Sequence, residues 1–189
     1  MLNYKLQIKK LILNSQLLTL NSKGFTYIEA ILYIAIVTLM MNALVSFAWN
    51  IINNNARSST QQEISSQGRY VSERILYEIR NASDLNAGTS TFGTNPGTLS
   101  LAETVSANNP TIITVTSGKA TIKLGAATAV NLNSNDTTVT NLVFTNNTSA
   151  DNKTKNISFT LTLQSNTTSN RADYIGSITI QSTGEIRSN

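Results

Sequence analysis

The first pattern in the chain is a long apolar run at residues 25–52. It is interrupted only by Thr26, Glu29, Thr38, Asn42, Ser46 and Asn50. As a helix these residues would reach roughly 42 Å, which exceeds the ~30 Å hydrocarbon core of a bilayer. The run therefore predicts a transmembrane helix. Residues 1–24, which contain a weakly amphipathic stretch from Leu6 to Leu20, precede it as a leader.

The second pattern, over residues 53–85, has the period of an amphipathic helix. Arg74 and Glu78 are spaced to pair one turn apart, and charged residues are expected on the face opposite the apolar one. The helix should end between Asn81 and Gly88, and Asn53, Asn54 and Asn55 are poor helix formers where we expect bending. The apolar or small positions three or four apart are Ile64, Gly68, Val71, Ile75, Ile79 and Ala82.

The third pattern, over residues 86–189, is alternation of apolar and polar residues, which predicts strands. Asn156 to Gln164 is the clearest case. Residues 111–116 and 120–124 flank Ser117-Gly118-Lys119 and predict a hairpin. Further strands are expected at 139–145, 174–181 and 99–102. The predicted fold class is α+β: a long N-terminal helix whose amphipathic half packs on one face of an antiparallel sheet in an exported head domain.

The charge of the chain is concentrated at its start. Four of its fourteen Lys and Arg residues, Lys5, Lys9, Lys10 and Lys23, precede Gly24, and the ten that follow are balanced by ten acids. A basic leader before an apolar run indicates a helix inserted in the cytoplasmic membrane with its N-terminus inside. Nucleic-acid binding by a basic surface is not indicated. Lys119, Lys123, Lys153 and Lys155 form the strongest basic candidate for contacting DNA, but they lack interleaved aromatic residues.

The composition disfavours catalysis. The chain contains no cysteine and no histidine, which removes thiol nucleophiles, imidazole bases and the usual zinc ligands. The acids after Glu29 are scattered, and no pair has a spacing that indicates a glycosidase. We expect no enzyme, no catalytic residues, no metal and no cofactor.

Glu29 is the most informative residue, because it is the one charged residue between Lys23 and Arg57. A charge in the middle of a spanning helix costs roughly 2.5–3.5 kcal/mol on insertion scales, so its presence suggests a partner. The surrounding residues, Lys23-Gly24 followed by Phe25-Thr26-Tyr27-Ile28-Glu29, resemble the cleavage and methylation signal of type IV prepilins. Within that family the chain looks most like the larger minor pseudopilins of the J or W type.

The resemblance implies a site and a function. Prepilin peptidase would cut between Gly24 and Phe25 and methylate the new amine of Phe25, with Glu29 as the fifth mature residue. A neighbouring subunit's ammonium paired with Glu29 would set the register between subunits. The chain would be a structural, minor subunit of a type IV pilus or a type II secretion pseudopilus. Its partners would be the peptidase, other pilin or pseudopilin subunits, the inner-membrane assembly platform and membrane lipid, before it joins an extracytoplasmic filament.

Other interpretations of the N-terminal part remain open. Glu29 could reach the headgroups by snorkelling, without a partner. Ser46-Phe47-Ala48 has the spacing that signal peptidase cleaves, which would release a secreted domain from Trp49. The alternative function is therefore a single-pass anchored or secreted surface adhesin or binding domain that belongs to no filament.

Overall fold

The computed structural model describes residues 24–168, 171 and 174–187. The predicted leader, apart from Gly24, and its stretch Leu6 to Leu20 lie outside the described residues. The chain divides into two compact units, Met1–Trp49 and Asn50–Asn189. Each is described by itself below.

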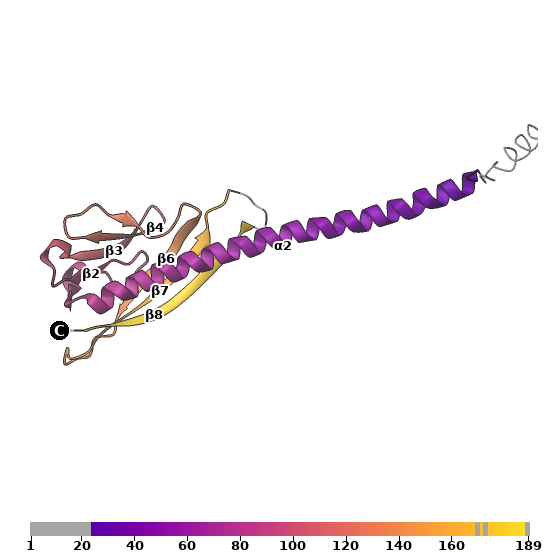
Figure 1. Cartoon of the computed structure of the whole chain (residues 1–189). Helices are drawn as coiled ribbons and strands as arrows, with labels where there is room; N and C mark the ends of the chain where they lie inside the picture. Colours follow the sequence, from indigo (N-terminus) through magenta and orange to yellow (C-terminus); the bar gives the residue numbers. More distant parts are fainter. Residues whose placement is uncertain (1–23, 169–170, 172–173, 188–189) are drawn as a thin grey trace, which may run out of the picture. The chain divides into compact units, whose positions relative to one another are not determined.

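The dominant helix is α2, Tyr27–Asn81, drawn in indigo to magenta in Figure 1. Its helical assignment runs without a break through Asn53, Asn54 and Asn55, where the sequence predicted bending. Three poor helix formers in a row are tolerated because tens of neighbouring residues propagate the helix from both sides. The helix ends at Asn81, inside the range predicted, and the Ser83 N–H then donates to the Ala102 carbonyl at 2.9 Å.

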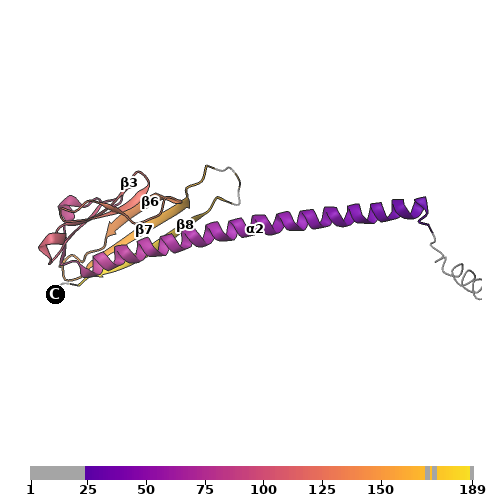
Figure 2. The same ribbon diagram turned by 45° about the horizontal axis from the view of Figure 1, so that its top comes forward.

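The second unit contains two antiparallel sheets. The five-stranded sheet has the order β1 (Asp84–Leu85), β2 (Leu99–Ala102), β3 (Thr111–Thr116), β4 (Lys119–Leu124) and β5 (Val130–Asn131). The three-stranded sheet has the order β6 (Thr137–Asn146), β7 (Lys155–Ser165) and β8 (Ser177–Ile186). Two 3-10 turns, η1 (Ala87–Thr89) and η2 (Ser106–Asn108), lie in the connections. The strands and α2 are seen from a second side in Figure 2.

The prediction of a single sheet was wrong, and the outer edge of β6 explains why. The Gly93 and Gly97 N–H groups donate to the Phe144 and Leu142 carbonyls at 2.9 and 2.7 Å. The Asn95 side chain donates to the Thr140 carbonyl at 3.0 Å. This loop takes up the hydrogen-bonding groups through which another strand would join β6, so the first five strands form their own sheet.

Most individual strand predictions are confirmed. The predicted hairpin is β3–β4, with Ser117 and Gly118 at φ 52° and 73°, the positive values that a type I′ turn requires. The clearest predicted strand is β7, where the inward residues Ile157, Phe159 and Leu161 are buried. The last strand was misplaced: it begins at Ser177, not Tyr174, and continues to Ile186.

The C-terminal half of α2 packs on the sheets through the face that the sequence predicted. All six predicted positions are buried and belong to one hydrophobic core shared with both sheets, except that Gly68 contributes a close approach in place of a side chain. Burying one such aliphatic side chain contributes about 1.5–3 kcal/mol. The coarse α+β layout is therefore confirmed: one long helix, apolar at its N-terminal end, packed on antiparallel sheets.

Glycines allow the helix and β8 to approach closely. A Cβ at Gly68 would lie 3.0 Å from Ile180 Cδ1, and one at Gly184 would lie 2.8 Å from Ile79 Cγ2. Gly184, near the end of β8, is therefore a packing requirement.

Candidate functional site

The predicted cleavage site lies just before α2. Gly24, Phe25 and Thr26 have no regular secondary structure, all three are exposed, and the helix begins at Tyr27. A Cβ placed on Gly24 would find no atom within 4 Å. The glycine is therefore not required by packing among the described residues, and the backbone on both sides of the Gly24–Phe25 bond is accessible.

Thr26 caps the helix, a role that the sequence analysis missed. The Ala30 N–H donates to the Thr26 carbonyl at 3.1 Å, and the Glu29 N–H donates to Thr26 Oγ1 at 3.4 Å. Thr26-x-x-Glu29 is the capping-box spacing, which was the available signal. Capping fixes the first turn of α2 two residues after Gly24. It also places the Glu29 carboxylate near the N-terminal end of the helix dipole, which favours a negative charge.

Glu29 is exposed, and among the described residues its carboxylate has one hydrogen-bond partner, which lies on the same helix face. The Tyr33 hydroxyl donates to Glu29 Oε1 at 3.4 Å, one turn further along. The Tyr33 ring also meets the Phe25 ring edge-to-face, with the ring centroids 5.6 Å apart. Tyr33 thus connects the predicted new N-terminal residue to the predicted register residue. Tyr33 was not among the residues predicted from the sequence to have a role.

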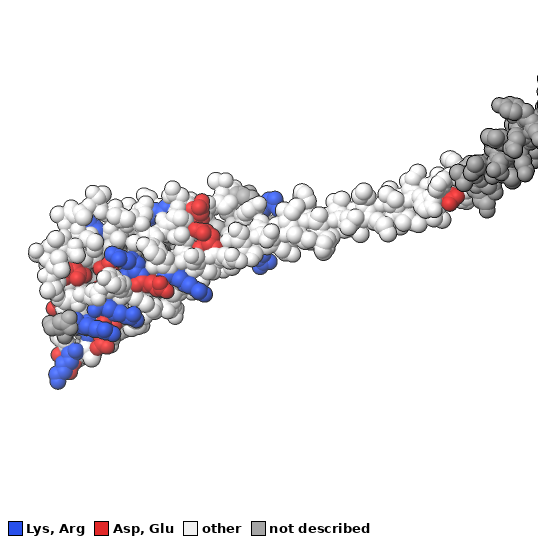
Figure 3. Space-filling model, viewed as in Figure 1, with Lys and Arg blue, Asp and Glu red and all other residues white. Residues whose placement is uncertain are grey.

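The surface of α2 beyond Glu29 is apolar and exposed. In Figure 3 the N-terminal part of the helix is uncharged apart from one acidic position, in agreement with the sequence between Lys23 and Arg57. Two polar side chains in this stretch bond to the backbone of their own helix: Thr38 Oγ1 donates to the Ile34 carbonyl at 2.8 Å, and Asn42 Nδ2 to the Thr38 carbonyl at 3.0 Å. Such internal bonds lower the cost of placing polar groups in an apolar medium.

Among the described residues, α2 alone is long and apolar enough to cross a membrane, judged by length and composition. A secretory signal sequence would meet the same criterion. Glu29 has no cationic partner within the described part of the chain, so the ammonium that the resemblance implies would have to come from elsewhere.

The four lysines that were the basic candidate for contacting DNA have different surroundings. Lys119 Nζ donates to the Thr137 carbonyl at 2.8 Å and also to the Ser134 carbonyl, so it joins the two sheets. Lys155 Nζ lies 2.5 Å from Asp84 Oδ1, and Lys153 Nζ lies 3.8 Å from Asp151 Oδ2. Three of the four charges therefore have partners within the chain.

The carboxylates of Glu78 and Glu103, which are far apart in the sequence, lie near each other in the structure. Glu78, predicted on the charged face, is buried; burial raises its pKa, and Arg74, with Nη2 2.6 Å from Glu78 Oε1, opposes that rise. Burial also raises the pKa of Glu103, and the negative charge of Glu78 adds to the rise. The predicted Arg74–Glu78 pair is confirmed, but it serves a partly buried charge.

No family model, no curated protein and no solved structure matches this chain. Among the described residues no three acidic side chains gather where they could hold a metal ion. The function of the chain is therefore inferred from the chemistry of its own residues.

Proposed function

We propose that this chain is a non-enzymatic structural subunit of a type IV pilin-like filament, either a pilus or a type II secretion pseudopilus. Prepilin peptidase cuts it after Gly24 and methylates Phe25. The subunit waits in the cytoplasmic membrane with its N-terminus inside, and the assembly platform then moves it into an extracytoplasmic filament among other pilin-like subunits. The pilin-like fold and the minor-subunit role are part of this proposal.

The observation that carries the proposal is the arrangement at the start of α2. An accessible Gly24–Phe25 bond precedes a capped helix whose first turn presents one carboxylate, and an exposed apolar surface follows. Cleavage there would create an α-amine with a reference pKa near 7.7–8, cationic at neutral pH. Among the described residues Glu29 has no cationic partner, so the amine of a neighbouring subunit would offset the cost of burying both charges.

The exposed apolar surface of α2 has a role in two environments. In the membrane, the side chains of residues 28–52 face lipid tails. In the filament, the same side chains face those of neighbouring helices, so one exposed surface suits both environments. The membrane-anchored or secreted adhesin is the competing function. It uses the surface only as an anchor and gives Glu29 no role.

Replacing Glu29 separates the two functions. Glu29→Ala should insert normally, because removing a charge favours insertion, and should enter filaments at least ten-fold less than wild type, because the interhelical ion pair is lost. Incorporation is measured by immunoblotting sheared filaments against the membrane fraction. Glu63→Ala, which removes an exposed acid from the second unit, is the matched control. Equal incorporation of wild type and Glu29→Ala would contradict the proposal and favour the anchored domain.

A further inference from the structure

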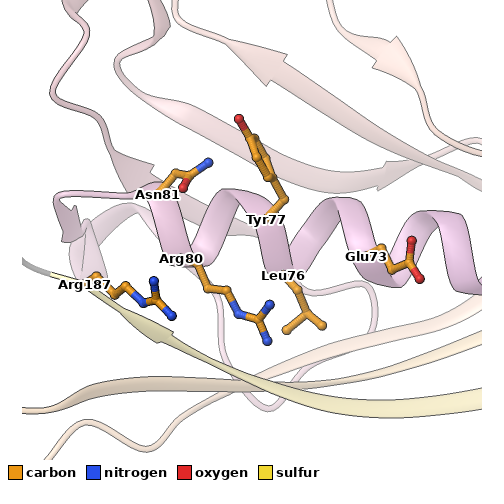
Figure 4. Close-up of a pocket in the computed structure, with 6 residues that line it drawn as sticks. All are labelled: Glu73, Leu76, Tyr77, Arg80, Asn81 and Arg187. Atoms are coloured by element: carbon orange, nitrogen blue, oxygen red, sulfur yellow. The ribbon is translucent and has the colours of Figure 1, made fainter.

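A pocket lined by two arginines lies on the second unit, beside the last turns of α2. Its volume is about 550 Å³, and it lies between the helix and the residue that follows β8. The side chains are drawn in Figure 4, where the guanidinium groups of Arg80 and Arg187 enter the pocket region from the helix and from the chain beyond β8. The lining residues are Glu73, Leu76, Tyr77, Arg80, Asn81 and Arg187.

Both arginines are unpaired within the described part of the chain. Neither has a hydrogen bond or an ion pair there, whereas the neighbouring Arg74 pairs with Glu78 and lies 5.3 Å from the centre of the Tyr77 ring. The C-terminal end of a helix dipole favours a cation at Arg80, but it does not use the donors of the guanidinium. Each guanidinium keeps five N–H donors, arranged in the fork geometry that fits a carboxylate or phosphate.

We propose that this pocket binds a carboxylate side chain on an acidic peptide segment of a partner protein. Arg80 and Arg187 hold the carboxylate from two sides with charge-assisted hydrogen bonds. Leu76, which is partly buried, offers an apolar surface to a neighbouring side chain of the segment. Asn81 carries an amide that can donate to and accept from the backbone of the segment.

The charges favour a carboxylate on a peptide over a phosphate polymer. Glu73 lines the same pocket, so two cations and one anion leave a single net positive charge, which matches one carboxylate. A nucleic-acid backbone presents a charge at every step and needs a basic track several residues long. Tyrosine and arginine, both present here, are also the residues that most often dominate protein interfaces. The pocket does not depend on cleavage at Gly24, so it stands or falls separately from the proposed function.

The test uses the full chain, labelled with ¹⁵N in detergent micelles, and follows the arginine Nε–Hε signals. The probes are acetyl-Leu-Glu-amide, its neutral match acetyl-Leu-Gln-amide, and inorganic phosphate. We expect the glutamyl peptide to shift the Arg80 and Arg187 signals saturably and to bind at least five-fold more tightly than the glutaminyl peptide. Arg80→Ala and Arg187→Ala should each weaken binding at least five-fold. Arg80→Lys should weaken it less, since it keeps the charge but loses the fork.

Arg57→Ala is the matched control, because Arg57 is exposed and outside this pocket. It should bind the glutamyl peptide like wild type. All of these variants change exposed side chains, and unchanged thermal midpoints would show that they fold. Equal binding of the two peptides, absence of shifts at both arginines, or wild-type affinity in both alanine variants would overturn the proposal. Tighter binding of phosphate than of the glutamyl peptide would reassign the pocket to phosphate groups.

Discussion

The Tyr33 hydroxyl donates to the Glu29 carboxylate at 3.4 Å while the Tyr33 ring contacts Phe25 edge-to-face. One side chain therefore holds both residues on which the proposed assembly mechanism depends. In an apolar medium a carboxylate oxygen that loses its donor is more costly to bury. Tyr33 is, in this account, a positioning residue for Glu29.

Tyr33→Phe removes the hydroxyl and keeps the ring. We expect the variant to insert normally and to enter filaments roughly five-fold less than wild type, a factor that corresponds to about 1 kcal/mol for a long hydrogen bond. Sheared-filament immunoblots measure this. The matched control is Tyr27→Phe, which removes an exposed hydroxyl with no hydrogen-bond partner among the described residues. If Tyr33→Phe and Tyr27→Phe behave alike, the hydrogen bond has no role in assembly.

The contact between α2 and β8 makes a stability prediction. Gly184→Ala would place a Cβ 2.8 Å from Ile79 Cγ2 and 3.2 Å from Ile79 Cβ, inside a buried interface. Overpacking of this kind costs about 1–3 kcal/mol, which lowers a thermal midpoint by roughly 2–4 °C for each kcal/mol. Circular dichroism of the full chain in detergent measures the midpoint. Gly88→Ala, where a Cβ would meet nothing within 4 Å, should leave it unchanged; equal midpoints in the two variants would contradict the packing argument.

The neighbouring carboxylates Glu78 and Glu103 predict a pH dependence. Burial and their mutual repulsion raise the pKa of Glu103 above its usual value of 4.5. The folded state therefore holds this proton more strongly than the unfolded state. The resulting stability is fully present below pH 4.5 and is lost as the pH rises through the raised pKa.

Glu103→Gln removes the charge that causes this loss. Because Glu103 is partly exposed, we discount the gain for solvent screening to less than about 1 kcal/mol. The thermal midpoint at pH 7.5 should then rise by roughly 1–4 °C, with little change near pH 4. Glu185→Gln, at an exposed position on β8, is the control. A lower midpoint at pH 7.5 in Glu103→Gln would show that the carboxylate stabilises the fold.

Local patterns predicted the elements well, because helix and strand periods are properties of neighbouring residues. Ile64 to Ile79 repeat at helical spacing, and Ile157 to Leu163 alternate, so both buried faces could be read from the sequence. The separation into two sheets depends on Asn95 and its loop occupying the edge of β6, some 45 residues away in sequence. No local period carries such a pairing. The burial of Glu78 has the same origin, since it depends on which strands cover the end of the helix.

The candidate site was predictable in part. Gly24, Phe25 and Glu29 were identified from their spacing, and the Thr26 cap could have been, because Thr-x-x-Glu is a local signal. The role of Tyr33 could not be predicted from the sequence, because an aromatic residue in an apolar run looks like any other lipid-facing side chain. The pocket lined by Arg80 and Arg187 was not predictable, because these two residues come together only through the path of β8 beside α2.

The most direct measurement is the N-terminus of the protein recovered from its native membrane, determined by mass spectrometry of the first peptide. The account predicts a chain that begins at Phe25 with a methyl group on its amine. It also predicts that Gly24→Val remains a full-length precursor, because a side chain at this exposed position blocks the peptidase without disturbing any packing. A start at Trp49, a start at Met1, or normal processing of Gly24→Val would contradict the central claim.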